Sequence, residues 1–264
     1  MVQVHTYADG KLVPYETIRQ WEAKRLAHVT SFVYRLLGKK QPPPSSTQTM
    51  DEQRSNLAEL KVEMGEDKMR KLLSPYLGLS RLATKAISFL SFGRRSYSIV
   101  EIAIVSGSTD DLGPSEFLDK LNRVLQSEDE ASSKKMRLMA CPDHYLLANT
   151  GGGTNAATME VIETTGGSPF PTQFFIRFGD ETGMRSQRDP AYEVQMVGAA
   201  RTKCGMVIGA VRHQIRREPG GLRMKLLIEF PLLTPNWMLR QHQAHLMCEF
   251  NNWVRDALAI APHP

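Results

Sequence analysis

WMLRQHQAHLMCEFNNWVRDAL, residues 237–258, decides the fold, because it is one long helical segment that closes a series of short strands. At 100° per residue, His245 and Glu249 lie one turn apart at the margin of the apolar side of this helix. The apolar side itself consists of Leu246, Phe250, Trp253 and Ala257. The helix is therefore expected to bury one face and to carry two potential metal ligands at its edge.

Short strand patterns with turn signals between them fill the region before this helix. The strand candidates are SIVEIAIVSG (98–107), MRLMAC (136–141), HYLLAN (144–149), ATMEVIETT (157–165), TQFFIRF (172–178), YEVQMVG (192–198), GMVIGAVRHQIRR (205–217) and LRMKLLIEF (222–230). Glycine-rich turns at 151–153, 166–169 and 219–221 suit antiparallel neighbours, and a capped helix is predicted over 114–126. The order predicts an α+β fold in which a curved antiparallel sheet wraps around the C-terminal helix, as in helix-grip (Bet v 1-like) proteins, and encloses a cavity.

The first ninety residues have a helical texture. Apolar residues recur at spacings of three and four over 15–39, a proline- and serine-rich linker follows at 41–49, and a second helix over 51–73 is expected to break at Pro75 before a third at 79–90. We expect residues 1–93 to form a helical N-terminal region and residues 94–264 a helix-grip catalytic domain. The apolar stripes of these helices predict packing over the cavity mouth, on the sheet, or against a second subunit in a homodimer.

Composition narrows the class of protein. The net charge of +5 comes from 33 basic and 28 acidic residues that are interspersed, without aromatics among the basic clusters, so nucleic acid is not the expected partner. Three widely spaced cysteines favour a reducing compartment. Residues 1–16 lack the apolar run of a signal peptide, and no stretch approaches the roughly 18 apolar residues of a membrane span. A cytoplasmic protein without a membrane partner is expected.

Further metal ligands are available upstream, at His144 in CPDHY and at Glu160 or Glu163 in ATMEVIETT. The period of two places Met159, Val161 and Glu163 on one strand face, so Glu163 is the better ligand candidate and Glu160 the reserve. Each residue also has an alternative without a metal. His245 and Glu249 could be an exposed helical pair, Glu163 a solvated strand end, and His144 a turn histidine.

These segments together resemble the zinc-dependent carbon–carbon hydrolases that deacylate diacetylphloroglucinol, with phloretin hydrolase as a relative. The resemblance lies in PDHY (142–145), ETTGGSPFP (163–171) and the HLMCE helix (245–249), and it covers roughly the last 130 residues. It implies a helix-grip fold and a Zn²⁺ ion held by two histidines and two glutamates, which map to His144, Glu163, His245 and Glu249. Glutamate and histidine also suit manganese or iron.

The chemistry that this site would perform is the hydrolysis of a carbon–carbon bond in an acylphenol or β-diketone, a small aromatic ketone substrate, by retro-Claisen deacylation. Catalytic candidates that donate or accept protons are His213, Tyr145, Tyr192 and His242. For each of them the alternative is a buried side chain that forms a hydrogen bond without a catalytic role. Two other functions remain open: a non-catalytic binding protein for a hydrophobic ligand, and an N-terminal interaction module joined to a degenerate enzyme.

Overall fold

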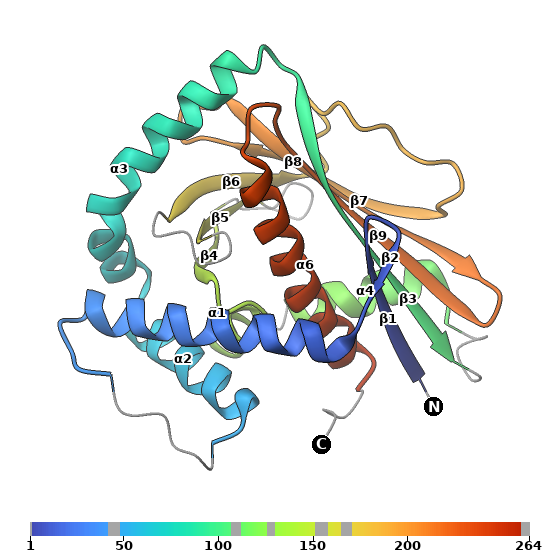
Figure 1. Ribbon diagram of the computed structural model, residues 1–264, viewed down its shortest axis with the longest axis horizontal. Helices are drawn as coiled ribbons and strands as arrows, with labels where there is room; N and C mark the ends of the chain where they lie inside the picture. Colours follow the sequence, from blue (N-terminus) through green and yellow to red (C-terminus); the bar gives the residue numbers. More distant parts are fainter. Residues whose placement is uncertain are drawn as a thin grey trace.

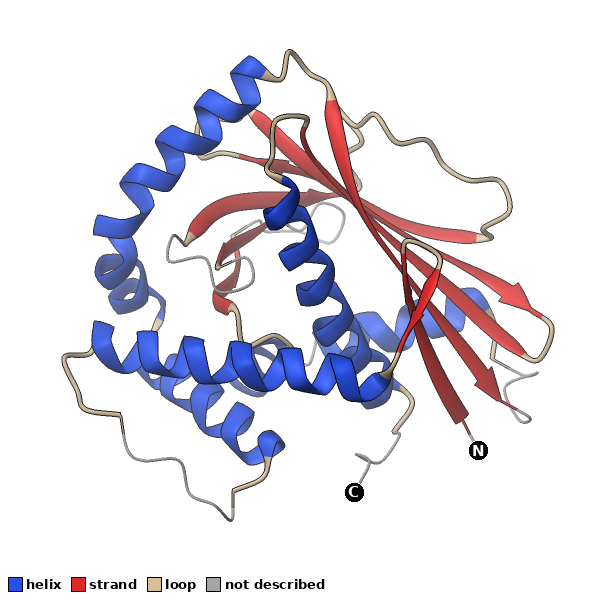
Figure 2. Ribbon diagram, in the orientation of Figure 1, coloured by secondary structure: helices blue, strands red, loops and turns tan. Residues whose placement is uncertain are grey.

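The computed structural model describes residues 2–41, 48–106, 112–125, 130–150, 158–164 and 171–259. Within them the chain is α+β, with six helices and an open antiparallel sheet of nine strands (Figures 1 and 2). The strand order is β2-β1-β3-β9-β8-β7-β6-β5-β4. The strands are β1 (Val2–Ala8), β2 (Lys11–Val13), β3 (Arg95–Ser106), β4 (His144–Asn149), β5 (Thr158–Glu163), β6 (Thr172–Phe178), β7 (Val194–Arg201), β8 (Val207–Glu218) and β9 (Gly221–Pro231).

The C-terminal helix α6 (Asn236–Ala257) lies across one face of this sheet (Figure 1). Its buried side chains, among them Leu246, Phe250 and Val254, share one hydrophobic core with Ile102 of β3 and Leu226 of β9. The expected apolar residues Leu246, Phe250 and Trp253 are buried, but burial is not confined to their face, because every residue of α6 from Ala244 to Arg255 is buried.

The other five helices lie around α6: the three before β3 pack against β4 and β5, and the two between β3 and β4 lie beside α6 (Figure 2). They are α1 (Tyr15–Leu36), α2 (Met50–Met64), α3 (Glu66–Leu90), α4 (Pro114–Leu125) and α5 (Glu130–Ala140). A second core joins Val29 of α1 and Leu73 of α3 to Leu146 of β4 and Ile162 of β5. Hydrophobic contacts thus cross the predicted boundary between residues 93 and 94.

The prediction for MRLMAC was wrong: residues up to Ala140 belong to α5, not to a strand. Met, Arg, Leu and Ala favour helices, and the segment contains no β-branched residue that would favour a strand. The predicted break at Pro75 was also wrong. Pro75 lies on an exposed position inside α3, and the chain leaves α2 instead at Gly65, whose φ of 72° suits glycine.

The N-terminal segment contains a hairpin that the helical prediction for residues 1–93 omitted. Strands β1 and β2 join through Asp9 and Gly10, which both have positive φ as a two-residue hairpin turn requires. β1 also pairs along β3, with Val4 opposite Ile104. The Asp-Gly dipeptide between alternating residues was the available signal.

Some predicted connections lie outside the described residues. They are most of the 41–49 linker, the glycine turn at 151–153 and most of the ETTGGSPFP segment. In the described part of the chain, no helix is both long enough and apolar enough to cross a membrane.

Candidate metal centre

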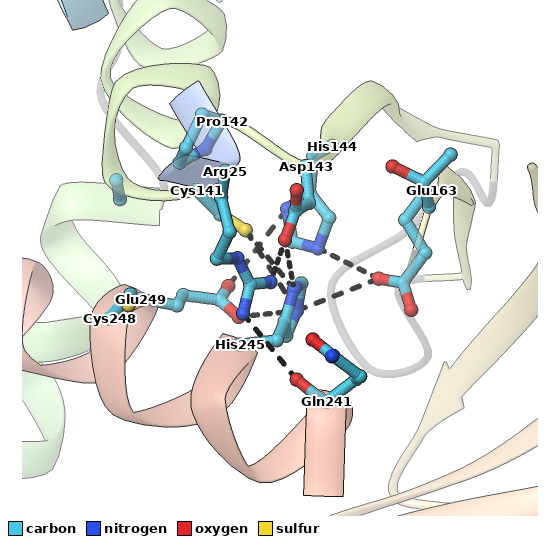
Figure 3. Close-up of polar contacts among 12 residues, drawn as sticks. Arg25, Cys141, Pro142, Asp143, His144, Glu163, Gln241, His245, Cys248 and Glu249 are labelled. Atoms are coloured by element: carbon cyan, nitrogen blue, oxygen red, sulfur yellow. Dashed lines mark hydrogen bonds and ion pairs between the residues drawn. The ribbon is translucent and has the colours of Figure 1, made fainter. Parts of the chain in front are cut away.

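The four predicted ligands come together from two neighbouring strands and the C-terminal helix (Figure 3). The register of the β4–β5 pair places His144 directly opposite Glu163. The helical spacing of four residues places His245 beside Glu249 on α6. Because α6 crosses the sheet at this end, the two pairs face each other.

The nitrogen and oxygen atoms that could bind a metal lie close to one another. Nε2 of His144 lies 2.9 Å from Oε2 of Glu163, and Nε2 of His245 lies 3.7 Å from the same oxygen. Nε2 of His245 is 3.2 Å from Oε2 of Glu249. A tetrahedral zinc site with bonds of about 2.0–2.1 Å has edges of roughly 3.3 Å, and these three separations lie around that value. The two ring nitrogens of His144 face different carboxylates: Nε2 faces Glu163, and Nδ1 lies 4.0 Å from Oε1 of Glu249.

All four side chains are buried, with His245 only 2% and Glu249 5% exposed. The alternatives of an exposed helical pair and of a solvated strand end are therefore wrong. The four residues also line a cavity of about 550 Å³ between α3, α6 and the sheet. Met159 and Val161 line the same cavity, so the predicted face of the 157–165 strand is the one that faces inward.

Cys141 is a further donor in this cluster. Its Sγ lies 3.5 Å from Nδ1 of His245. Donor atoms of Cys141, His144, His245 and Glu249 all lie within 4.8 Å of one another, as do those of Glu163, His242 and His245. The buried cluster could therefore hold a metal ion, although Cys141, unlike Glu163, is not among the residues that line the cavity.

The charges of the cluster shift one another's pKa values. Burial alone would lower the pKa of His144, but Cys141 and Glu249 outweigh it and raise the value to about 10. Burial likewise opposes ionisation of Glu163, yet the positive charges of His245 and His144 lower its pKa to about 2. Without an ion, His144 and His245 are therefore both protonated, and a divalent cation would displace those protons.

The carboxylate of Asp143, which was not among the residues predicted from the sequence, contacts the Nδ1 side of the His245 ring. Oδ2 of Asp143 lies 3.3 Å from Nδ1 of His245, and Asp143 itself pairs with the guanidinium of Arg25 in α1. Such an outer carboxylate holds the proton on Nδ1 and leaves Nε2 free for a metal. The available signal was its place in CPDHY, one residue before His144, where Cys141 also lies. Arg25 had no local signal.

Two of the four catalytic candidates lie in the cavity. His242 stacks on His245, with ring centroids 5.3 Å apart, and burial lowers its pKa to about 3. His213 of β8 packs edge-on against Phe250, and burial lowers its pKa to about 4. Both ring nitrogens of His213 are buried and lack a hydrogen-bond partner among the described residues. Each imidazole is therefore neutral and faces the cavity.

The structure does not bring Tyr145, Tyr192 or Glu160 to the centre, and these predictions are corrected. Tyr145 follows His144 on β4 and therefore points to the opposite face, where it packs edge-on against Phe32. Tyr192 lies under the cations of Arg216 and Lys225, away from the cavity. Glu160 alternates with Val161 in β5.

Glu160 also has a partner of its own: its Oε2 accepts a hydrogen bond from Arg70 of α3 at 2.8 Å. That ion pair lies on the helical side of β5, so Glu160 is not a reserve ligand. Glu160 is thus a buried glutamate of β5, the strand that also carries Glu163, but Glu160 is not part of the metal-ligand cluster.

No model of a known protein family matches the chain, and no curated protein matches it. Function is therefore inferred from the arrangement of its own residues.

Proposed function

We propose that the protein is a metal-dependent hydrolase that cleaves a carbon–carbon bond of an acylphenol or β-diketone-like substrate by retro-Claisen deacylation. The observation that carries the proposal is that the buried side chains of His144, Glu163, His245 and Glu249 lie together in the wall of a large, mainly apolar cavity. The position of α6 against the sheet supports a helix-grip fold, in which such a cavity lies between sheet and helix.

Zinc is the proposed ion, with His144, Glu163, His245 and Glu249 as its ligands. Two neutral imidazoles and two carboxylates balance the charge of a divalent cation. Nε2 of His144 is hydrogen-bonded to Glu163, whereas its Nδ1 is a buried nitrogen without a hydrogen-bond partner in the described part of the chain, and Nδ1 is therefore the nitrogen open to an ion. Glu163 is preferred to Cys141 because an ion that meets a substrate must be held from the cavity side, which Glu163 lines.

A zinc ion held by His144, Glu163, His245 and Glu249 would supply Lewis acidity, which would polarise the acyl carbonyl and make the attacking water more acidic. In the reaction, the water oxygen bonds to the acyl carbon, and the bond from that carbon to the ring breaks with its electron pair left on the ring. The ring carbon takes up one proton, and the other proton of the water leaves with the carboxylic acid. An electron-rich phenolic ring stabilises the displaced pair by tautomerism.

His213 is the proposed proton relay. A neutral imidazole accepts a proton at one ring nitrogen while it gives up the proton on the other, so a low pKa does not prevent the transfer. Because neither nitrogen of His213 has a protein partner in the described residues, both are available to substrate and water. His242, whose Nδ1 lies 3.4 Å from the hydroxyl of Ser98, is held in place and shapes the wall beside His245.

The test is elemental analysis of protein purified without a histidine tag, together with an assay of acid release from a panel of acylphenols. The wild-type protein should contain stoichiometric zinc and release acid from at least one acylphenol. Glu249→Gln should lose both properties, because it removes a buried ligand charge.

The matched control is Glu160→Gln, which makes the same chemical change in a buried glutamate that binds Arg70 instead. It should keep zinc and activity. A wild-type protein free of bound metal, or a Glu249→Gln variant that retains full activity, would contradict the proposal.

The second candidate is a non-catalytic carrier of a hydrophobic ligand, which the mainly apolar cavity lining supports. A carrier should bind an apolar ligand equally well in the wild type and in Glu249→Gln, and it should contain no stoichiometric zinc. Ligand binding measured on the two proteins separates the functions.

A further inference from the structure

Large exposed apolar side chains lie along the C-terminal half of α3, in the α3–β3 turn, and at the β9–α6 turn with the first residues of α6. Of the twelve exposed large hydrophobic residues in the described part of the chain, seven belong to these segments. Phe92 is 81% exposed and Trp237 56%. We call the seven residues the apolar rim: Leu79, Leu82, Phe89, Leu90, Phe92, Leu233 and Trp237.

The two turns are joined directly. The backbone N–H of Leu233 donates to Oγ of Ser91 at 3.1 Å, and the N–H of Leu232 donates to the carbonyl of Arg94 at 3.0 Å. The rings of Phe89 and Phe92 lie 6.3 Å apart. The apolar side chains of the two turns therefore form one surface, at the end of the molecule where α3 meets β3 and α6 begins (Figure 1).

The rim surrounds the mouth of the cavity that contains the metal centre. Leu79 and Trp237 are both more than half exposed, and both line the cavity. A residue with both properties marks the place where a cavity meets solvent. Ile87 of α3 and Met238 of α6 continue the apolar lining inward.

The charged side chains of the two segments that carry the rim all have one sign. Residues 79–97 and 231–248 contain five basic side chains and no aspartate or glutamate. Arg95 forms an ion pair with the buried carboxylate of Glu229. The exposed cations of these two segments are Arg81, Lys85, Arg94 and Arg240. Arg185, whose Nε donates to the carbonyl of Gly93, adds another, and the acidic Glu181 of the same loop pairs with Arg212.

Phe92 adds an independent observation. It has a φ of 49°, a left-handed conformation that is costly for a bulky side chain and that glycine adopts freely. The chain nevertheless places an exposed phenylalanine there, directly before Gly93. Strained residues of this kind persist at sites where the side chain has a use.

We propose that the apolar rim docks on an anionic lipid membrane, so that a membrane-dissolved substrate enters the cavity directly. Aromatic and leucine side chains surrounded by Lys and Arg are the composition of interfacial membrane surfaces. A second copy of the chain fits less well, because the same cations would face one another across a twofold axis. The expectation of no membrane partner rested on the lack of an apolar span, which a docking surface does not need.

The test measures binding to vesicles. The wild-type protein should co-sediment with vesicles of phosphatidylcholine and phosphatidylserine, bind phosphatidylcholine alone more weakly, and leave the anionic vesicles as salt rises from about 0.1 M to about 1 M. The tryptophan emission should shift to the blue on binding because of Trp237, which is exposed, whereas Trp253 is buried and Trp21 is partly buried against the first core. The Phe89→Ser, Phe92→Gly double variant should bind the anionic vesicles at least about tenfold more weakly than the wild type does.

The fold of that double variant is protected, because glycine suits the φ of residue 92 and residue 89 is exposed. Leu12→Ser is the matched control, because Leu12 is 57% exposed on the β1–β2 hairpin, away from the rim. Three outcomes would overturn the proposal: no binding of the wild type to anionic vesicles, equal binding of the double variant, or a wild-type dimer that the double variant loses. The metal chemistry is independent of all three.

Discussion

His245 is bound on both sides of its ring, and this arrangement defines the centre at the scale of single residues. Nε2 faces Glu249 and Glu163, while Nδ1 faces Asp143. The i,i+4 spacing predicted the first side, because helix geometry alone places His245 beside Glu249. The second side depends on Arg25, more than a hundred residues away in sequence, and no local pattern carries that information.

We expect Asp143→Asn to weaken zinc binding by about 10- to 100-fold, because the amide no longer fixes the proton on Nδ1 of His245. A competition titration against a chromophoric chelator measures the affinity. Asp180→Asn is the control, since Asp180 pairs with Arg201 at 2.9 Å far from the centre, and should bind as the wild type does. A zinc affinity of Asp143→Asn equal to that of the wild type would show that Asp143 does not support zinc binding by His245.

Zinc affinity should also depend on pH. The pKa of His144 is raised to about 10 and that of His245 well above its ordinary value, so both carry protons near neutral pH in the metal-free protein. Since only a neutral imidazole binds zinc, affinity should fall by about tenfold per unit, for each proton displaced, as pH drops from about 8 to about 6. Titrations that give one affinity across this range would contradict the raised pKa values.

At the scale of elements, the turn before β4 brings Asp143 and His144 to the centre, and a lysine of α2 holds that turn. Nζ of Lys61 donates to the carbonyls of Pro142 and His144 at 2.7 and 2.6 Å. Lys61 is almost fully buried, and burial lowers its pKa to about 7.

Lys61→Met should therefore lower the free energy of unfolding by about 2 kcal/mol, because two buried carbonyls lose their donor. It should also weaken zinc binding. Urea unfolding of the metal-free protein measures the first effect. Lys68→Met, an exposed change in α3, should leave both quantities unchanged. A Lys61→Met variant as stable as the Lys68→Met control would show that the turn needs no such support.

Strands with β-branched residues and clear turns were predictable from the sequence, and β3–β9 lie where the pattern placed them. The register of β4 with β5 was not, because pairing depends on which strands meet. Residues 136–141 and Pro75 show the limit of local signals: helix propensity and tertiary packing determined both outcomes.

At the scale of the whole molecule, the N-terminal region and the sheet share their cores. β1 pairs along β3, and α1–α3 cover β4 and β5. α1 also supplies Arg25 to the centre. The sequence predicted that these helices would pack over the sheet or the cavity mouth, but it could not choose between these and a second subunit, because apolar stripes do not specify a partner.

A fragment of residues 94–264 should accordingly fail to unfold cooperatively and should bind no stoichiometric zinc. Circular dichroism during heating and elemental analysis test both points against the full chain. A fragment that unfolds in one transition and carries zinc like the full chain would establish residues 94–264 as a self-sufficient domain.

Zinc X-ray absorption spectroscopy on the tag-free protein tests the central claim most directly, because it reports which atoms touch the ion. We predict a shell of nitrogen and oxygen at about 2.0–2.1 Å with the outer scattering of imidazole, in agreement with His144, Glu163, His245 and Glu249. A sulfur neighbour at about 2.3 Å would make Cys141 a ligand instead, and a shell of water alone would end the case for a metal centre.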